Sequence, residues 1–524
     1  MRREWRDVMT PYRTVSWMIV PMKKFCIGLI FLLSTISSGI SADTGSSVGV
    51  PQNSPLSEAT EDCLGCHEDE TPGIVADWLA SRHARVSVAS ALKKPVVSRR
   101  VSAVSVPDSL STVAVGCYEC HGLNPAKHQD NFEHNDYKIN VVVTPPDCST
   151  CHPVEVEQFA HSKKANAIAN LEKNPLFHQL VNTLTQQKDL DNGSLRLKGA
   201  APMAKAKSCF ACHGTHVKVK GLKTVQIESD EVEVPDLTNW PNQGVGRHNP
   251  DGSFGACTAC HPRHSFSLEI ARKPYTCAQC HLAPDVPAWE VFKESKHGNI
   301  FLSQSSKWNW DRVPWRPGED FKAPTCSTCH NALLANKEDE IIVERNHDFG
   351  SRLWVRIFGL PYSHPQPKDG RTFRIRNADG LPLPVTFAGK PAAPYLISAS
   401  EQNKRQQQMK RVCGSCHSTD WSNQFFMQMD KTNREADQMV RTATKLMQIA
   451  WGNKLADPAN PFDESLELSW VRHWLFYASS VRYGAAMGGP DYVGFKNGWW
   501  NLTKNLTDLE EQVQAKTRQK KTKK

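Results

Sequence analysis

Sixteen of the seventeen cysteines in this chain lie in pairs with two residues between them, and a histidine directly follows each pair. Two thiols one helical turn apart can add to the two vinyl groups of one porphyrin, and the imidazole that follows can then bind the iron. The sequence therefore predicts eight covalently bound c-type haems, each with one proximal histidine. The eight motifs are Cys63, Cys66 and His67; Cys117, Cys120 and His121; Cys148, Cys151 and His152; Cys209, Cys212 and His213; Cys257, Cys260 and His261; Cys277, Cys280 and His281; Cys326, Cys329 and His330; and Cys413, Cys416 and His417.

Disulfides or zinc knuckles could explain a single motif of this kind. Eight motifs with no stray thiol among them exclude both explanations for the chain as a whole. The one remaining cysteine, Cys26, lies in the N-terminal leader.

The other twelve histidines are candidate distal ligands, which would bind an iron on the face of the haem opposite the motif histidine. His83 in WLASRHA and His297 in FKESKHG have matching contexts, each on an expected short helix with an aromatic residue five positions earlier, so both are predicted to be distal ligands. Four further candidates are His134, His161, His264 and His347. The rest have no distinguishing context, although one or two of them are expected to bind iron: His128, His178, His216, His248, His364 and His473.

The chain begins with a predicted signal peptide over residues 1–42. Lys23 and Lys24 precede the apolar run FCIGLIFLLSTISSGI, which ends in small residues. The basic stretch before this run is long, and we hypothesise that translation starts at Met18 or Met22. The signal predicts export to the periplasm or an equivalent compartment, and no later stretch is apolar enough to predict a transmembrane anchor.

The mature chain is predicted to be mainly α-helical. The haem-binding body is predicted to comprise residues 43–417. The stretch that holds the motifs has about fifty residues per haem, so we expect short helices and loops and little β-sheet. The intervals between motifs are too uneven for a tandem repeat. Apolar residues at helical spacing after His417 predict long helices in a C-terminal region, residues 418–524, which either pack on the body or form an oligomer interface.

The formal net charge of +9 resides at the two ends of the chain. The first 42 residues and the Lys-rich tail AKTRQKKTKK together account for all of it. Haem propionates would make the body more negative still. The charge pattern therefore argues against binding of nucleic acid.

Several long segments resemble the octahaem hydroxylamine oxidoreductases and the related hydrazine dehydrogenases. They include FEHNDYKINVVVTPPDCSTCHPVE, RHNPDGSFGACTACHPRHSFSLEIARKPYTCAQCH, WEVFKESKHG and the C-terminal GGPDYVGFKNGWW. The resemblance spans nearly the whole mature chain. It implies that the fourth haem, with His213 below its iron, is catalytic and lacks a distal ligand, and that seven bis-histidine haems relay electrons.

The resemblance also assigns roles to two residues outside the motifs. In oxidising members a C-terminal tyrosine of a neighbouring subunit is bonded to the catalytic haem; the matching residue here is Tyr492, which implies a homotrimer and favours oxidation. The family places an Asp-His pair after the sixth motif. Asp285 matches the aspartate, as an acceptor of protons, but Val286 replaces the histidine. Asp285 could instead cap a helix that Pro287 helps to start.

The implied function is oxidation of hydroxylamine or hydrazine at the fourth haem, with electrons passed to a soluble partner such as a small cytochrome c. Tyr362 and His364, in a Pro-rich loop, could border the same pocket. Two alternatives remain open at this point. The chain could reduce nitrite or nitric oxide, or it could be a non-catalytic electron-transfer subunit, paired with a paralogue, whose pocket is degraded by Val286.

Overall fold

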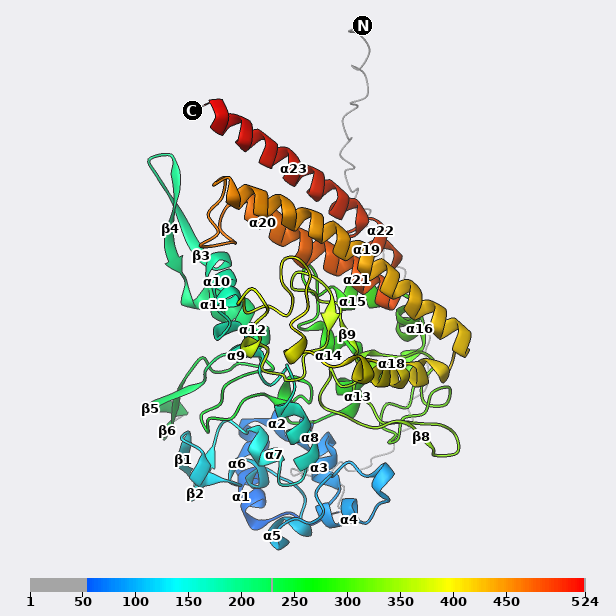
Figure 1. The fold of residues 1–524 in the computed structure, drawn as a ribbon. Coiled ribbons are helices and arrows are strands. Elements are labelled where there is room, and N and C mark those ends of the chain that lie inside the picture. The colour runs from blue at the N-terminus through cyan, green and yellow to red at the C-terminus, as the bar shows by residue number, and fades with distance from the viewer. Residues whose placement is uncertain (1–53, 228–229, 523–524) are drawn as a thin grey trace, which may run out of the picture. The chain divides into compact units, whose positions relative to one another are not determined.

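The first described part of the chain consists of short helices joined by loops (Figure 1). The computed structural model describes residues 54–227 and 230–522. The predicted signal peptide lies outside them. Serine side chains start several of these helices by accepting a backbone N–H, as Ser57, Ser81 and Ser87 do. The helices are α1 (Glu58–Glu70), α2 (Pro72–Ala80), α3 (Arg82–Arg85), α4 (Val88–Leu92), α5 (Asp108–Ser111), α6 (Tyr118–His121), α7 (Pro145–Cys148) and α8 (Pro153–Ala160).

The middle of the chain continues this pattern. Its helices are α9 (Ala167–Glu172), α10 (Pro175–Leu184), α11 (Pro202–Lys207), α12 (Cys209–His213), α13 (Leu268–Arg272), α14 (Pro274–Ala278), α15 (Ala288–Glu294), α16 (Lys296–Gln304), α17 (Cys326–His330) and α18 (Ala399–Gly414). Short 3-10 turns lie at Val96–Ser98, Pro125–Lys127, Cys257–Ala259, Ser305–Lys307, Thr372–Arg374 and Ala393–Tyr395.

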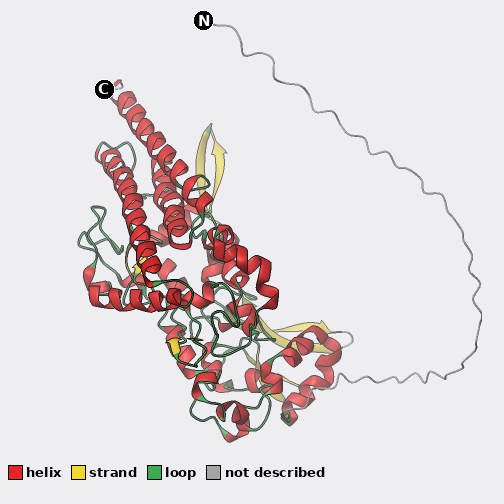
Figure 2. Cartoon of the chain, turned by 90° about the vertical axis from the view of Figure 1, so that its right-hand side faces the viewer, coloured by secondary structure: helices red, strands yellow, loops and turns green. Residues whose placement is uncertain are grey.

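Strands occur only as antiparallel pairs in the part of the chain that the structure describes (Figure 2). Asn135 and Asp136 join the first pair, and Asn192 and Gly193 join the second, all with positive φ, as tight hairpin turns require. The pairs are β1 (Asn131–His134) with β2 (Tyr137–Asn140), β3 (Gln186–Asp191) with β4 (Ser194–Ala200), β5 (Lys218–Ile227) with β6 (Asp230–Thr238), β7 (Leu334–Ala335) with β8 (Ile341–Val343), and β9 (Val355–Arg356) with β10 (His364–Pro365).

Long helices follow the last motif, as the apolar periodicity predicts. They are α19 (Thr419–Gly452), α20 (Ser465–Val471), a π-helical turn (Arg472–Tyr477), α21 (Ala478–Met487), α22 (Pro490–Gly494) and α23 (Trp499–Thr522). Helices α19, α21 and α23 run side by side in both views (Figures 1 and 2). Their buried faces form a core with the loop around residue 360, which includes Leu360, Val440, Met447, Trp470, Val481, Leu502 and Leu509. The prediction of a mainly α-helical fold is confirmed.

Candidate functional site

Most cysteine motifs form a single helical turn. In five of them a direct hydrogen bond closes the turn, because the histidine N–H donates to the carbonyl of the first cysteine at 2.8–3.0 Å. The histidines that donate in this way are His121, His152, His261, His281 and His417. This turn places two thiols and one imidazole on the same side of the chain, which is the arrangement that covalent haem attachment needs.

One internal cavity of about 2370 Å³ collects these groups. Both cysteines and the histidine of every one of the eight motifs line it, and the remaining walls are mainly apolar. No disulfide joins the described cysteines. Among the described residues, no group of three or more His, Cys, Asp or Glu side chains could hold a bare metal ion. The cavity therefore fits macrocycles, whose apolar faces can replace a side-chain core, better than it fits zinc.

Four pairs of histidine rings face each other across this cavity with their centres 6.1–6.5 Å apart. Since metal–imidazole bonds are about 2 Å long, two imidazoles on opposite faces of one iron have ring centres roughly 6 Å apart. Each pair joins one motif histidine to one predicted distal histidine. The pairs are His67 with His134, His152 with His83, His121 with His264, and His417 with His297.

Burial lowers the pKa of six of the eight paired imidazoles and so favours the neutral form, which is the form that binds a metal. Burial lowers the pKa of His83 and of His264 to about 4. His347 behaves alike, since burial, followed by the charge of His261, lowers its pKa to about 3. His347 thus lies near two motif histidines, His261 and His152, but makes no ring contact with either of them.

Backbone carbonyls orient several motif histidines through their Nδ1 atoms. His121 is 2.7 Å from the carbonyl oxygen of Asn140, and His330 is 3.1 Å from that of Phe349. Such a contact fixes the tautomer and leaves Nε2 free for the metal. His213 of the fourth motif has the same kind of contact, at 3.4 Å from the carbonyl of Ala167.

His161 differs from the other predicted distal ligands. Its side chain is exposed, it does not line the cavity, and its Nδ1 is 2.9 Å from the carbonyl of Glu157 in its own helix. Three of the weaker candidates have protein partners instead. His216 and His248 contact each other at 2.9 Å, and His473 contacts Asn505 at 2.9 Å inside the C-terminal helices.

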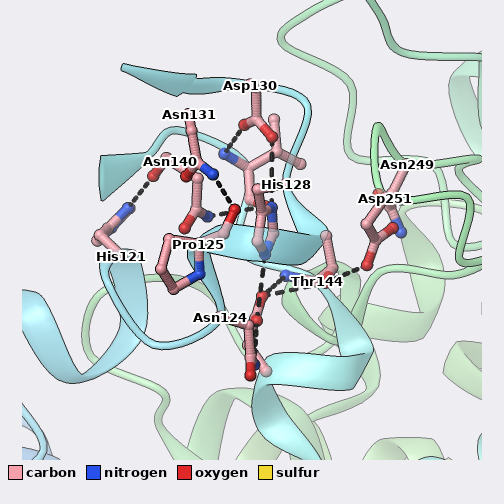
Figure 3. A network of polar contacts seen from close by, with 12 residues as sticks. His121, Asn124, Pro125, His128, Asp130, Asn131, Asn140, Thr144, Asn249 and Asp251 are labelled. Carbon is pink, nitrogen blue, oxygen red and sulfur yellow. Dashed lines mark hydrogen bonds and ion pairs between the residues drawn. The ribbon is translucent and has the colours of Figure 1, made fainter. Parts of the chain in front are cut away.

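His128 belongs to a buried polar network that holds the loop between the second and third motifs (Figure 3). Its ring nitrogens lie 3.3 Å from Asp130 and 3.2 Å from Asp147, directly before Cys148. Asp130 also accepts the backbone N–H of Val142 at 2.8 Å. Burial alone would lower the pKa of His128, but the two carboxylates raise it to about 9. His128 is therefore a charged structural residue rather than a ligand.

This network predicts that stability depends on pH. The folded pKa of His128 lies above its usual 6.5, so its contribution is complete below about pH 6.5 and is lost as pH rises through about 9. We expect the free energy of unfolding to fall by roughly 2–3 kcal/mol over that window. Urea titrations at several pH values would measure the change, and His128→Gln should flatten it. An equally steep pH dependence in the variant would contradict this role.

Thiols of different motifs lie next to one another. Four such contacts join different motifs. They are Cys63 with Cys117 (first and second motifs), Cys148 with Cys257 (third and fifth), Cys212 with Cys280 (fourth and sixth), and Cys277 with Cys326 (sixth and seventh). Three further pairs are near enough for their charges to interact, Cys120 with Cys151, Cys260 with Cys277, and Cys329 with Cys413. The motifs thus follow a continuous spatial order, 1-2-3-5-6-7-8, with the fourth beside the sixth.

Three side chains from distant segments meet beside the fourth motif. Asp285, before α15, lies near Cys212 and Tyr483, and Arg356 of β9 lies near Tyr483 and His213. Asp285, Tyr483 and Arg356 all line the cavity. Burial raises the pKa of Asp285, and burial followed by the charge of Asp285 raises the pKa of Tyr483 far above its usual value. Both groups therefore hold a proton more firmly than exposed ones.

The sequence pointed to Asp285 but gave no reason to choose Tyr483 or Arg356. Asp285 does not cap α15, whose N-cap residue is Pro287 and has no side-chain cap. Val286, which stands where the resembled family has histidine, lines the cavity. Tyr483 is one of the tyrosines near the C-terminus, and the sequence does not distinguish it from the others. Only the folded chain shows that it lies near the fourth motif.

Tyr492 lies elsewhere in its own chain. Its side chain is 6% exposed on α22, it does not line the cavity, and the ammonium of Lys496 lies 5.5 Å from its ring centre. Tyr362 and His364 are also away from the cavity wall. The Tyr362 hydroxyl donates to the carbonyl of Phe387 at 2.7 Å within the C-terminal core, and His364 is buried against the carbonyl of Pro365.

Comparisons with known proteins agree with this geometry. A family model described as seven times multi-haem cytochrome CxxCH matches residues 250–345, and one described as cytochrome c554 and c-prime matches residues 147–234. A solved structure described as a hypothetical multiheme protein is 43% identical with a TM-score of 0.83, and the match covers 89% of this chain and 97% of that one.

Two relatives come from Kuenenia stuttgartiensis. One, a probable nitrite reductase-hydroxylamine oxidoreductase fusion protein, is 24% identical over 418 residues, and the match covers 76% of this chain. The reducing HAO-like protein complex shares the fold, with 19% identity, a TM-score of 0.57, and 89% and 87% of the two chains covered. The chain belongs to the multihaem cytochromes c and is similar to hydroxylamine-oxidoreductase-like proteins. It spans 38% of the length of the fusion protein.

Membership of the multihaem cytochromes c means that motif cysteines bind haem covalently, and electron transfer is the property that such proteins share. The cavity lined by the motifs fits this cofactor. Within the described residues, no helix combines the length and apolar character that crossing a bilayer would require.

Proposed function

We propose that this chain reduces a small nitrogen oxyanion, with nitrite as the first candidate, at the haem held by Cys209, Cys212 and His213. The observation that carries the proposal is that two half-buried proton-holding groups, Asp285 and Tyr483, and the half-buried Arg356 interact electrostatically beside the fourth motif. When bound, the haem supplies a coordination position for the substrate nitrogen and a route for electrons.

The protein's own groups suit an anionic substrate that must gain protons. Each N–O bond that breaks releases an oxygen that leaves as water, which requires two protons. Tyr483 and Asp285 can donate them from a position inside the cavity. Arg356 can attract the anion and orient it through its planar donors. Val286 and Met487 add apolar wall and limit access of water.

The remaining haems serve as the relay in this proposal. Eight c-type haems would occupy the cavity, and the four histidine pairs described above would each supply both axial ligands of one haem. The unbroken spatial order of the motifs supports electron passage between them. We further propose an exported protein that receives electrons from a soluble partner such as a small cytochrome c, assembled as a homotrimer or with a paralogue.

A second candidate function is oxidation of hydroxylamine or hydrazine. The match of PDYVGF to the family's cross-linking tyrosine favours it, because a bond from Tyr492 of one subunit to the fourth haem of another would tune that haem for oxidation. In this case Asp285 would accept protons rather than donate them. Tyr492 is only 6% exposed within its own chain, which favours the reductive function instead, because the side chain would have to leave this position to reach another subunit.

Three measurements on the purified haem-loaded protein separate these functions. We expect dithionite-reduced protein to bind one carbon monoxide per chain, and to turn over nitrite faster in the presence of a reduced viologen than it oxidises hydroxylamine with a cytochrome c acceptor. Mass spectrometry should recover the peptide with Tyr492 free of haem. A cross-linked peptide with faster oxidation would establish the second candidate, and absence of carbon monoxide binding would leave only an electron-carrying role.

A further inference from the structure

Three segments of the chain repeat one local sequence pattern. They read WLASRHA over residues 78–84, FAHSKKA over residues 159–165 and FKESKHG over residues 292–298. Each has an aromatic residue, a serine three positions later, and a small residue three positions after the serine. The residue just before the small one is histidine in two copies, His83 and His297, and lysine in the third, Lys164.

The three segments also share one local structure. The serine side chain accepts the N–H of the small residue at 3.2 Å in the first copy, 3.2 Å in the second and 3.0 Å in the third. The aromatic side chains, Trp78, Phe159 and Phe292, are 5–7% exposed. The small residue is buried in all three copies, with Ala84 and Ala165 each 1% exposed. The chain therefore presents the residue before it from an equivalent position in all three copies.

In the two histidine copies this position faces a motif histidine across the cavity. The ring centres of His83 and His152 are 6.4 Å apart, and those of His297 and His417 are 6.1 Å apart. In the lysine copy the Nζ atom of Lys164 lies 3.3 Å from Nε2 of His281, the proximal histidine of the sixth motif. Lys164 therefore faces the metal-binding nitrogen of a motif histidine, as the two distal histidines do.

The surroundings of Lys164 leave its amine directed at the sixth motif. It lines the cavity and is half-buried, and the ring centre of Phe349 is 5.0 Å from its Nζ. No carboxylate forms an ion pair with it among the residues that the structure describes, although Lys273 and Lys496 each have one. Its Nζ atom therefore has His281 as its nearest polar partner in the cavity.

We propose that Lys164 is the distal ligand of the sixth haem, which gives that haem imidazole and amine coordination where the histidine copies give two imidazoles. The exposed His161, three positions earlier in the same segment, does not take this role. The inference rests on the haem content proposed above but not on the direction of the reaction. It places the unusual haem directly beside the fourth motif, since Cys212 contacts Cys280.

Near-infrared magnetic circular dichroism of the oxidised, haem-loaded protein tests the ligand directly, because low-spin haems with imidazole and amine ligands have a charge-transfer band distinct from that of bis-imidazole haems. We expect the wild type to show the imidazole-amine band with the intensity of one haem. Lys164→His should convert it to a bis-imidazole band with no change in haem content. A wild-type spectrum with bis-imidazole bands alone would overturn the proposal.

Carbon monoxide titration of the reduced protein provides an independent count. Lys164→Ala should bind one more carbon monoxide per chain than the wild type, and His297→Ala should do the same while it leaves the amine band intact. Lys296→Ala, which changes the exposed neighbour of His297, should match the wild type. An unchanged count in Lys164→Ala would contradict the assignment. A wild type that binds no carbon monoxide but keeps the amine band would refute the proposed function alone.

Discussion

Asp285→Asn is expected to lower kcat for nitrite reduction by roughly 10²-fold or more, with a smaller change in KM, because an amide cannot donate the proton that a buried carboxyl supplies. Burial raises the pKa of Asp285, so its acid form persists to a higher pH than that of an exposed aspartate. Wild-type activity should therefore fall as pH rises through that raised pKa. Steady-state rates between pH 5 and pH 9, with a viologen donor, would measure both effects.

Tyr483→Phe serves as a second test of the same pocket. It removes the other proton donor without changing the size of the ring, and a loss of similar order is expected. Asp508→Asn, on the exposed side of α23, is a matched control in which the same chemical change lies far from the motifs. Wild-type kcat in both Asp285→Asn and Tyr483→Phe would remove the basis for the proposed chemistry.

Asp437→Asn is expected to lower the free energy of unfolding by about 3–5 kcal/mol, because it leaves the buried guanidinium of Arg482 without a counter-charge. Arg482 is 0% exposed and forms an ion pair with Asp437 between α21 and α19. Asp437 also accepts the backbone N–H of Ser363 at 3.2 Å, and Arg482 donates to the carbonyl of Pro361 at 3.3 Å. Urea unfolding followed by far-ultraviolet circular dichroism would give the value.

The matched control for this pair is the double variant Asp437→Asn with Arg482→Met. Removal of both charges together should restore much of the lost stability, since a buried ion pair contributes little net free energy once desolvation is counted. A double variant no more stable than Asp437→Asn would mean that Asp437 acts through Ser363 rather than through the charge of Arg482. Activity should also fall in the single variant, because Tyr483 follows Arg482 directly in α21.

The haem-binding framework could be predicted from the sequence because its signals are local. A cysteine motif specifies its own turn, so the eight attachment sites needed no knowledge of distant contacts. The predictions for His83 and His297 rest on a local signal too, as each follows an aromatic residue and a serine that together set the start of a short helix. The long helices after His417 follow from apolar periodicity over many turns.

The substrate pocket could not be predicted in this way. Tyr483 and Arg356 reach the fourth motif from segments well over a hundred residues away in sequence, and neither has a local pattern that marks it. His161 shows the opposite difficulty. It is a histidine in a segment that faces the cavity, but the helical turn directs it to solvent and directs Lys164 inward. Residue type therefore points to His161, whereas the position in the segment points to Lys164.

The spatial order of the motifs has a consequence for how the proposed reaction is connected. The fourth motif contacts the sixth but is not a link between any two others in that order. In the proposed relay, the first and the eighth haem would be the two ends of the electron-transfer chain, and the fourth haem would form a side branch at which the substrate binds. Electrons would then pass between the first and the eighth haem without passing through the fourth. The protein would therefore transfer electrons between its proposed partners even when no substrate is bound.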